Sequence, residues 1–283
     1  MRFLIVIICA CAAGFGQLLA ADEPVRLLTY TDYAPYVSDK VPEGGMLTEV
    51  IKTAYAEQGV ELEVVYVPWK RGYRMVQEGE AIGTFSWQRT KDRERDFLLS
   101  DALFADSNLI FTTLADFKQI EDLRSRHKRG ETSIICIPLG WTIPARFKAL
   151  VEEKIVARVA PEKIGSCLEL MHGGRAHILN IPPLTVYFEM NALAERLSVE
   201  RDVIPGFRVV DFDPGPLATT HILFARTKEG AAAAAIFKKG FQAILANGQY
   251  SKIIKQHLAL YPGMGREQVL KDLKEIGLLP AAP

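Results

Sequence analysis

The residues best placed to bind a small molecule lie where predicted strands end. Ser86 and Gln88 stand at the carboxyl end of a strand predicted over residues 81–87, and a Gly-Trp-Thr run at 140–142 joins a predicted strand to a predicted helix. Ligands of open α/β sheets sit beyond the carboxyl ends of the strands, and free backbone amides at a helix start can hold an anion. Both segments therefore stand at positions that a ligand of such a sheet can reach, and exposed loop residues are the alternative for Ser86 and Gln88.

Catalytic chemistry is not indicated by any comparable arrangement. The sequence has no Ser/His/Asp order, no metal-ligand pair and no glycine-rich phosphate loop, and His172, His177 and His221 are scattered. A catalytic cleft needs a positioned acid or base. We therefore expect no catalytic residue, no metal and no cofactor.

The N-terminus has the pattern of a secretory signal peptide. Met1-Arg2 precedes an almost unbroken apolar run over residues 3–21 that ends in small residues. One positive charge, an apolar stretch and small residues are typical of a cleaved export signal, so we predict cleavage after Ala20 or Ala21. An uncleaved membrane anchor is the alternative, because a run of this length could just span a bilayer.

The four cysteines form two pairs. Cys9 and Cys11 lie within the apolar run and leave with the signal peptide, unless Cys11 carries a lipid anchor. Cys136 and Cys167 are an even pair in an exported chain, which favours a disulfide. Such a bridge would stabilise the fold by ~3–4 kcal/mol in the chain-entropy model. Two buried thiols are the alternative.

The composition is that of an ordinary globular protein. The chain has 283 residues, 49% of them hydrophobic and 24% charged, and its 34 basic side chains balance 34 acidic ones. So apolar a chain is not disordered. A chain without net charge or a basic block is not expected to bind nucleic acid through its phosphates. The length suggests about two domains.

Strands and helices alternate in the first half of the mature chain. Strands are predicted over 25–30, 62–67 and 81–87, and helices over 46–58 and 68–79, where apolar residues recur at helical spacing. This β-α-β-α-β order calls for a parallel sheet covered by helices.

The second half repeats this plan. Strands are predicted over 133–138, 155–159 and 177–181, and helices over 144–153 and 161–171. The repetition is of architecture rather than of sequence, and it predicts two similar α/β lobes in one compact unit. Further helical segments are predicted over 229–248, 249–260 and 266–277.

Several short patterns, each weak alone, occur in an informative order. They are Tyr33-Ala34-Pro35-Tyr36, Gly45-Met46-Leu47, Val67-Pro68-Trp69-Lys70-Arg71, Ser86-Trp87-Gln88-Arg89-Thr90-Lys91-Asp92-Arg93, Phe97-Leu98-Leu99-Ser100-Asp101, Gly173-Gly174-Arg175 and Gly248-Gln249-Tyr250. Together, over about residues 25–260, they resemble the extracellular solute-binding proteins of family 3, the amino-acid-type receptors of bacterial ABC importers. The Pro-Trp-Lys-Arg run resembles a distant branch of that family.

The resemblance implies a two-lobed α/β fold, of the type II periplasmic-binding-protein kind, with two hinge strands that cross between the lobes. It divides the chain into a signal peptide (1–21), a first lobe (22–110 and 215–262), a second lobe (111–214) and a C-terminal helical tail (263–283). Only the closed form of such a protein contacts its ligand with both lobes, so binding drives closure. The implied protein is a periplasmic monomer whose partners are a small-molecule ligand and a membrane ABC permease.

The resemblance also assigns roles to individual residues. Arg93 matches the arginine that grips a ligand carboxylate in the family, where the planar guanidinium donates two parallel hydrogen bonds; a surface arginine is the alternative. Tyr33 matches an aromatic residue that stacks over the ligand. Ser86, Gln88 and, in the second lobe, Thr142 match positions that contact the ligand.

The tryptophans have less definite expectations. Trp141 would cover the cleft or the hinge. Trp69 shares a helix face with Tyr73, which favours a place in the core. Trp87 is expected to point away from its two polar neighbours into the core, because side chains alternate along a strand.

One departure from the family pattern affects the expected ligand. Amino-acid receptors of the family usually offer a second-lobe acidic residue to the ligand's ammonium group, and Pro182 stands at that position. Asn180 and Glu189 are candidate substitutes, and His177, which replaces a common aspartate, is expected to be a strand residue. The departure leaves an α-amino acid in question and a carboxylate or another small polar solute as the expected ligand.

We therefore expect a binding protein rather than an enzyme, one that captures a small, carboxylate-bearing solute for an ABC importer. Two alternatives remain. Periplasmic dehydratases that act on cyclohexadienyl acids share the two-lobed fold, and fold alone does not separate the two functions. A free ligand receptor that serves a sensory partner is equally compatible with binding.

Overall fold

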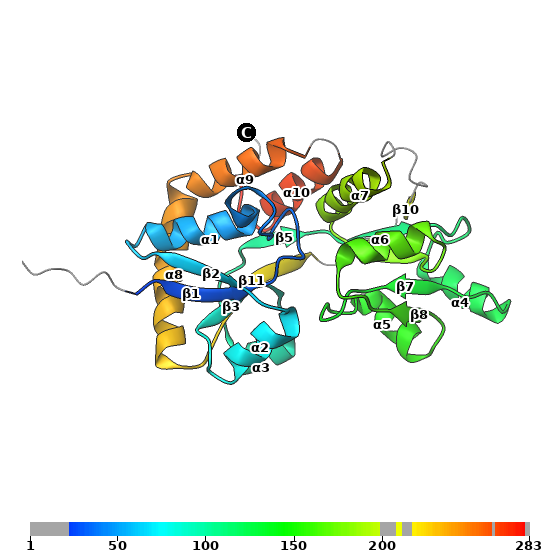
Figure 1. The fold of residues 1–283 in the computed structure, drawn as a ribbon, viewed down its shortest axis with the longest axis horizontal. Helices are drawn as coiled ribbons and strands as arrows, with labels where there is room; N and C mark the ends of the chain where they lie inside the picture. Colours follow the sequence, from blue (N-terminus) through cyan, green and yellow to red (C-terminus); the bar gives the residue numbers. More distant parts are fainter. Residues whose placement is uncertain (1–22, 199–207, 211–216, 262–263, 281–283) are drawn as a thin grey trace, which may run out of the picture.

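The molecule consists of two α/β lobes that lie side by side, each built on its own sheet (Figure 1). The first sheet takes its strands from residues 25–106 and 218–224, and the second from residues 109–210. We call each sheet with its covering helices lobe 1 and lobe 2. The computed structural model describes residues 23–198, 208–210, 217–261 and 264–280.

Lobe 1 has a sheet in the order β2-β1-β3-β11-β4, with β5 paired to β11. Its first three strands run parallel, as the alternation of strands and helices predicts, whereas β11 is antiparallel to β3, β4 and β5. The strands are β1 (Val25–Thr29), β2 (Leu62–Tyr66), β3 (Gly83–Gln88), β4 (Leu98–Leu99), β5 (Phe104–Asp106) and β11 (Ala218–Phe224).

Helices bury the apolar side chains of this sheet. The apolar stripe of α1, including Leu47, Val50 and Ile51, is fully buried. Helix α8 packs closely on α1 because Gly240 has no side chain: a Cβ there would lie 1.7 Å from the carbonyl oxygen of Ala54. The helices of lobe 1 are α1 (Met46–Ala56), α2 (Trp69–Gln77), α3 (Lys91–Asp96), α8 (Lys228–Ala246) and α9 (Gln249–Ala259), with a 3-10 turn at Pro42–Gly44.

Lobe 2 has a sheet in the order β10-β6-β9-β7-β8, in which β7, β8 and β9 run parallel. The predicted disulfide is formed: Cys136 of β7 is bonded to Cys167 of α6, and so ties the sheet to a covering helix. The elements are β6 (Leu109–Thr112), α4 (Ile120–Lys128), β7 (Ile134–Cys136), α5 (Ala145–Glu152), β8 (Ala157–Val159), α6 (Ile164–His172), β9 (Ile178–Ile181), α7 (Pro183–Leu197) and β10 (Arg208–Val210).

The chain crosses between the lobes at a hinge. Ser107 and Asn108 connect β5 of lobe 1 to β6 of lobe 2, and the return from β10 to β11 runs through residues 211–216, outside the described residues. Helix α10 (Met264–Glu275) lies against β5 and α7. Its buried Asp272 accepts hydrogen bonds from the backbone N–H of Ser107 at 2.6 Å and from the Ser107 hydroxyl at 3.0 Å. The C-terminal helix is therefore fastened to the hinge itself.

The two-lobed α/β fold predicted from the sequence is confirmed. Helices α3, α4 and α7 were not predicted from the sequence, and the antiparallel pairing of β11 in lobe 1 and of β6 and β10 in lobe 2 was not predicted either. The predicted signal peptide lies outside the described residues. In the part of the chain that the structure describes, no helix combines the length and apolarity needed to cross a membrane.

Candidate ligand-binding cleft

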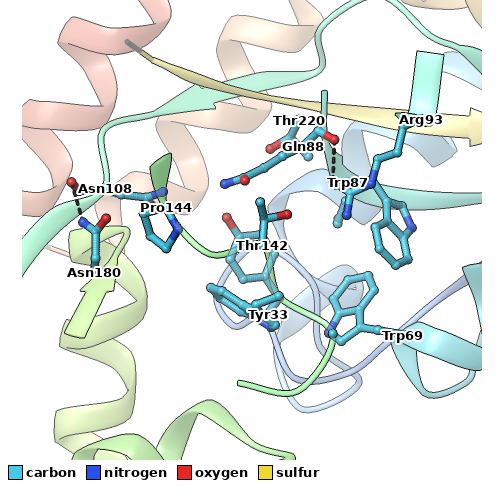
Figure 2. Close-up of a pocket in the computed structure, with 13 residues that line it drawn as sticks. Tyr33, Trp69, Trp87, Gln88, Arg93, Asn108, Thr142, Pro144, Asn180 and Thr220 are labelled. Carbon is cyan, nitrogen blue, oxygen red and sulfur yellow. Dashed lines mark hydrogen bonds between the residues drawn. The ribbon is translucent and has the colours of Figure 1, made fainter. Parts of the chain in front are cut away.

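A cavity opens between the two lobes and is lined by residues from both (Figure 2). It encloses about 640 Å³ of space, the solvent in its open mouth included. All seven residues predicted to contact the ligand lie in its wall; their roles as ligand contacts remain predictions. The lining residues are Tyr33, Trp69, Ser86, Trp87, Gln88, Arg93, Asn108, Gly140, Trp141, Thr142, Pro144, Asn180 and Thr220.

A β-bulge at the end of β3 brings three consecutive residues to this wall. Trp87 pairs with His221 and Phe85 with Ile222, so Ser86 has no partner on β11. Ser86 also has a φ of 73°, in the left-handed region that non-glycine residues rarely adopt. Bulges re-aim side chains and occur near functional sites. Here the bulge breaks the alternation, so Trp87, which belongs to the core as predicted, also lines the cavity together with its polar neighbours.

Arg93 is held at the cavity without an acidic partner. It lies in the first turn of α3, which Thr90 caps by accepting a hydrogen bond from the Arg93 backbone N–H. Its guanidinium donates to the carbonyl oxygen of Gln88 at 2.6 Å and lies 4.7 Å from the ring centre of Trp87. Among the described residues no Asp or Glu forms an ion pair with it, and burial lowers the pKa of the guanidinium. The structure therefore presents an oriented cation with donors to spare.

Aromatic rings form much of the remaining wall, and two of them meet across the cleft. Tyr33 of lobe 1 stacks on Tyr36 with centroids 4.8 Å apart and meets Trp141 of lobe 2 edge to face at 5.5 Å. The Tyr33 hydroxyl donates to the buried Asp106 carboxylate at 3.2 Å, which fixes the ring. Burial raises the pKa of Tyr33 well above its ordinary value.

Trp69 is both a core and a cavity residue. It is 8% exposed and packs against Trp87 with centroids 5.2 Å apart, as the helix-face argument predicted. It also lines the cavity, and its indole N–H has no hydrogen-bond partner in the part of the chain that the structure describes. The buried hydroxyl of Ser86 likewise lacks a partner. Buried donors without partners are uncommon in folded proteins, and both of these are in the wall beside Arg93.

The loop after β7 closes the cavity from lobe 2. Gly140 adopts a φ of 90°, and a Cβ there would lie 3.2 Å from Trp69 Cβ, so the two lobes are in van der Waals contact at this point. Trp141 packs against the cores of both lobes, which fits its predicted place over the cleft. Thr142 and Pro144 complete this wall before α5 begins.

Asn180 has one end engaged by the hinge and the other near the cavity. Its side-chain amide donates to the carbonyl oxygens of Asn108 and Leu109 at 2.9 and 3.0 Å. Two carbonyl oxygens can only accept, which fixes the amide orientation and leaves the Oδ1 of Asn180 as the acceptor of that side chain. The side-chain oxygen of Asn108, also in the wall, is buried without a partner.

The other candidates at the departure from the family pattern are not part of the wall. Pro182 is the N-cap of α7 and Glu189 lies within that helix, and neither lines the cavity. The Nδ1 of His177 accepts a hydrogen bond from the backbone N–H of Ile134 at 3.1 Å, in keeping with the expected strand role.

A polar contact joins the lobes beside the cavity. Asp32, on the loop after β1, accepts a hydrogen bond at 2.8 Å from the backbone N–H of Ile164, at the N-terminus of α6 in lobe 2. Burial raises the pKa of the Asp32 carboxyl to about 7, although the Ile164 N–H opposes this change. Together with the contacts of Trp141 and Gly140, this bond indicates a closed arrangement of the lobes.

Six lining residues were not on the predicted list of ligand contacts. Trp69 and Trp87 were assigned to the core, and nothing in the local sequence reveals the bulge that brings Trp87 to the cavity. Gly140 directly precedes the predicted residues Trp141 and Thr142, and its place after a predicted strand could have indicated it. Asn108, Pro144 and Thr220 join the wall through the hinge and the return strand, whose pairing the sequence does not show.

Comparison with known families gives a match over most of the chain. The family model of the bacterial extracellular solute-binding proteins, family 3, matches residues 25–259. A comparison with curated protein sequences found no match.

Solved structures share the fold at low sequence identity. An ancestral arginine-binding protein bound to arginine has a TM-score of 0.66 and 16% identity, over 83% of this chain and 98% of that one. An amino-acid ABC transporter substrate-binding protein from Streptococcus pneumoniae bound to L-arginine has a TM-score of 0.62 and 18% identity, over 83% and 94%. An ancestral amino-acid-binding protein, a precursor of cyclohexadienyl dehydratase, has a TM-score of 0.63 and 17% identity, over 82% and 94%.

Proposed function

This chain belongs to the bacterial extracellular solute-binding proteins of family 3, and from that premise we propose that it is an exported receptor that captures a small carboxylate-bearing solute between its lobes for an ABC importer. The observation that carries the proposal is the guanidinium of Arg93, which is half-buried at the cleft and has no acidic partner among the described residues. A buried cation without a counter-ion is costly. A ligand carboxylate would supply the missing charge through paired, charge-assisted hydrogen bonds.

The surroundings of Arg93 support an anionic ligand group. Its contacts with Gln88 and Trp87 hold the guanidinium in one orientation, so little side-chain entropy is left to lose on binding. The unpartnered N–H of Trp69 and hydroxyl of Ser86 are further donors in the same wall. A carboxylate has four lone-pair positions and can accept from several donors at once.

The arrangement of the lobes supports a capture mechanism. Tyr33 and Trp141 touch across the cleft, and Asp32 reaches the N-terminus of α6. A ligand that contacts both lobes stabilises the closed form over an open one, which loses half of those contacts. The closed form would then be what the permease recognises, in line with the ABC transporter role of the pneumococcal protein that shares the fold.

The wall favours binding over catalysis. Its titratable side chains are Tyr33, with a pKa well above its ordinary value, and Arg93, which keeps its proton in proteins. Neither is poised to exchange a proton near neutral pH, as general acid–base catalysis requires. Dehydratase activity would appear as turnover of a bound cyclohexadienyl acid, and a sensory receptor would bind without a permease.

The proposal is tested by a thermal-shift screen of the mature protein against small carboxylates, amino acids, amines and sugars. A micromolar ligand at millimolar concentration adds ~4 kcal/mol to the free energy of unfolding. The screen is repeated with Arg93→Ala and with Arg89→Ala, a neighbouring arginine that is exposed and paired with Glu94. We expect carboxylates to stabilise the wild type and Arg89→Ala but not Arg93→Ala. Stabilisation by uncharged solutes alone, or equal stabilisation of Arg93→Ala, would contradict the proposal.

A further inference from the structure

The charge of the cavity wall is one-sided. Of its thirteen residues in the described chain, Arg93 alone carries a formal charge, and the wall contains no Asp or Glu. The remaining polar groups are hydroxyls, amides and indole N–H groups, which are neutral. An occupant of the closed cavity therefore meets a net charge of one positive unit.

This charge discriminates between two kinds of carboxylic acid. A monocarboxylate neutralises Arg93 and leaves the closed site without net charge. A zwitterionic amino acid does the same with its carboxylate but adds an ammonium group that has only neutral acceptors to face. A desolvated ammonium without a counter-ion is strongly disfavoured, and Arg93 repels it in addition.

Two carboxyls beside Tyr33, those of Asp106 and Asp32, do not supply the missing negative charge. Asp106 lies behind Tyr33, whose hydroxyl donates to it, and its own burial raises the pKa of the carboxyl to about 7. Asp32 accepts from the Ile164 N–H at the lobe interface and does not line the cavity. Both carboxyls are thus directed to protein donors rather than to the occupant.

The rest of the wall indicates the shape of the molecule. Tyr33 and the three tryptophans offer apolar ring surface on both sides of the cleft, which suits a flat apolar body. The side-chain oxygen of Asn108, which has no partner among the described residues, and the side-chain oxygen of Asn180 are neutral acceptors, which suit a hydroxyl or an amide N–H.

We propose that the ligand is a monocarboxylate that lacks an ammonium group and carries an aromatic or similarly flat apolar body. This inference rests on the proposed function, because it names the ligand class of the same cleft. The proposed ligand class differs from that of amino-acid receptors of the family, which usually offer an acidic residue to the ligand's ammonium group.

The test uses pairs of acids that share a skeleton and differ by the ammonium group. The pairs are 3-phenylpropanoate with L-phenylalanine, 3-(4-hydroxyphenyl)propanoate with L-tyrosine, 4-methylpentanoate with L-leucine, and glutarate with L-glutamate. Affinity is measured by calorimetric titration of the mature protein. We expect the ammonium-free acid of at least one aromatic pair to bind at least about tenfold more tightly than its amino acid. The neutral 3-phenylpropanamide should not bind, because it cannot pair with Arg93.

The outcomes separate this inference from the proposed function. Amino acids that bind as tightly as their ammonium-free partners, and lose affinity in Arg93→Ala, would overturn the inference and leave the proposed function standing. Binding of the amide as tight as that of the acid would contradict the carboxylate anchor and hence both. A panel in which no acid of either kind binds would also contradict both.

A single isosteric change provides an independent test. Asn108→Asp adds a carboxylate to the wall at an atom that now lacks a partner. We expect it to weaken binding of the ammonium-free acid about tenfold or more and to bring the amino acid of the same pair to equal or greater affinity. Melting of the unliganded variant shows that it folds. Unchanged preference in the folded variant would overturn the inference.

Discussion

At the scale of single residues, several polar side chains of the cleft lack a hydrogen-bond or ion-pair partner among the described residues. Arg93 has no carboxylate partner among the described residues, and Ser86 and Trp69 carry buried polar atoms without partners. Each of these is a cost in the unliganded protein. The cost is understandable if the ligand supplies the partners, as a binding site requires.

Ser86 allows stability and binding to be separated. Its φ of 73° disfavours any side chain, and its buried hydroxyl has no partner. Ser86→Gly should therefore raise the free energy of unfolding of the unliganded protein by about 1 kcal/mol and weaken carboxylate binding several-fold. Thermal melting and calorimetric titration check the two effects. A variant that melts lower than the wild type would show that the hydroxyl contributes to the fold.

Asp106 should make stability depend on pH. Burial raises the pKa of its carboxyl to about 7, opposed by the Tyr33 hydrogen bond and reinforced by Asp272. Between about pH 4 and 7 the folded state holds a proton that the unfolded state has released, so this contribution to stability is lost as pH rises through that window. At pH 8 the loss is at most about 4 kcal/mol.

The isosteric Asp106→Asn should remove that dependence. Its amide oxygen still accepts from the Tyr33 hydroxyl, so the variant should melt like the wild type at pH 4 and above it at pH 8. Melting curves at the two pH values check this. A variant that melts lower than the wild type at pH 8 would show that the ionised carboxylate is needed in the fold.

At the scale of elements, short irregular segments decide what reaches the ligand. The alternation along β3 predicted Trp87 in the core, where it lies, but the bulge at Ser86 also brings it to the cavity wall. Bulge formation depends on pairing with β11, which comes from residues 218–224, about 130 positions away in the chain. The local pattern near residues 81–88 contains no sign of that partner. This is why the strand and the cavity positions of Ser86 and Gln88 could be predicted, whereas the place of Trp87 in the wall could not.

The link between β1 and α6 should make affinity depend on pH. Burial raises the pKa of the Asp32 carboxyl to about 7, and the negative charge of Glu189 adds to this rise. The hydrogen bond from the Ile164 N–H and the positive charges of Lys163 and Lys40 lower the pKa and so oppose the rise. Opening the lobes exposes Asp32 and returns its pKa toward the ordinary range. Closure therefore takes up a proton between about pH 4 and 7, and affinity should fall as pH rises through that window.

Asp32→Asn tests this coupling. Its side-chain oxygen can still accept from the Ile164 N–H, but it does not titrate. We expect carboxylate affinity in the wild type to fall at least several-fold between pH 5.5 and 8, and to be nearly constant in the variant. Calorimetric titrations of both proteins with the carboxylate at pH 5.5 and 8 measure these affinities. An equal slope in both proteins would place the titrating group elsewhere.

At the scale of the whole molecule, more of the fold than of the site could be predicted from the sequence. The alternating strand and helix patterns predicted two α/β lobes, and the order of the short motifs predicted the family to which the chain belongs. The hinge contacts of Asp272 and the place of Asn108 in the wall depend on how the chain crosses and returns. Such long-range pairings leave no periodic signal in the sequence, so they require the structure.

The central claim is that a carboxylate binds to Arg93 between the lobes, and the fluorescence of the protein's own tryptophans can report such binding. The chain has three tryptophans, Trp69, Trp87 and Trp141, and all of them line the cavity. The most direct measurement is a tryptophan-fluorescence titration of the mature protein with an acid that stabilises it, in the wild type, Arg93→Ala and Arg89→Ala.

We predict a saturable change in emission at one ligand per chain in the wild type and in Arg89→Ala. In Arg93→Ala the affinity should fall about 30-fold or more, because a buried charge pair has lost one member. Thermal stabilisation by the acid without any change in emission would place binding outside the cleft. Equal titrations of Arg93→Ala and the wild type would remove Arg93 as the anchor, and either result would contradict the account.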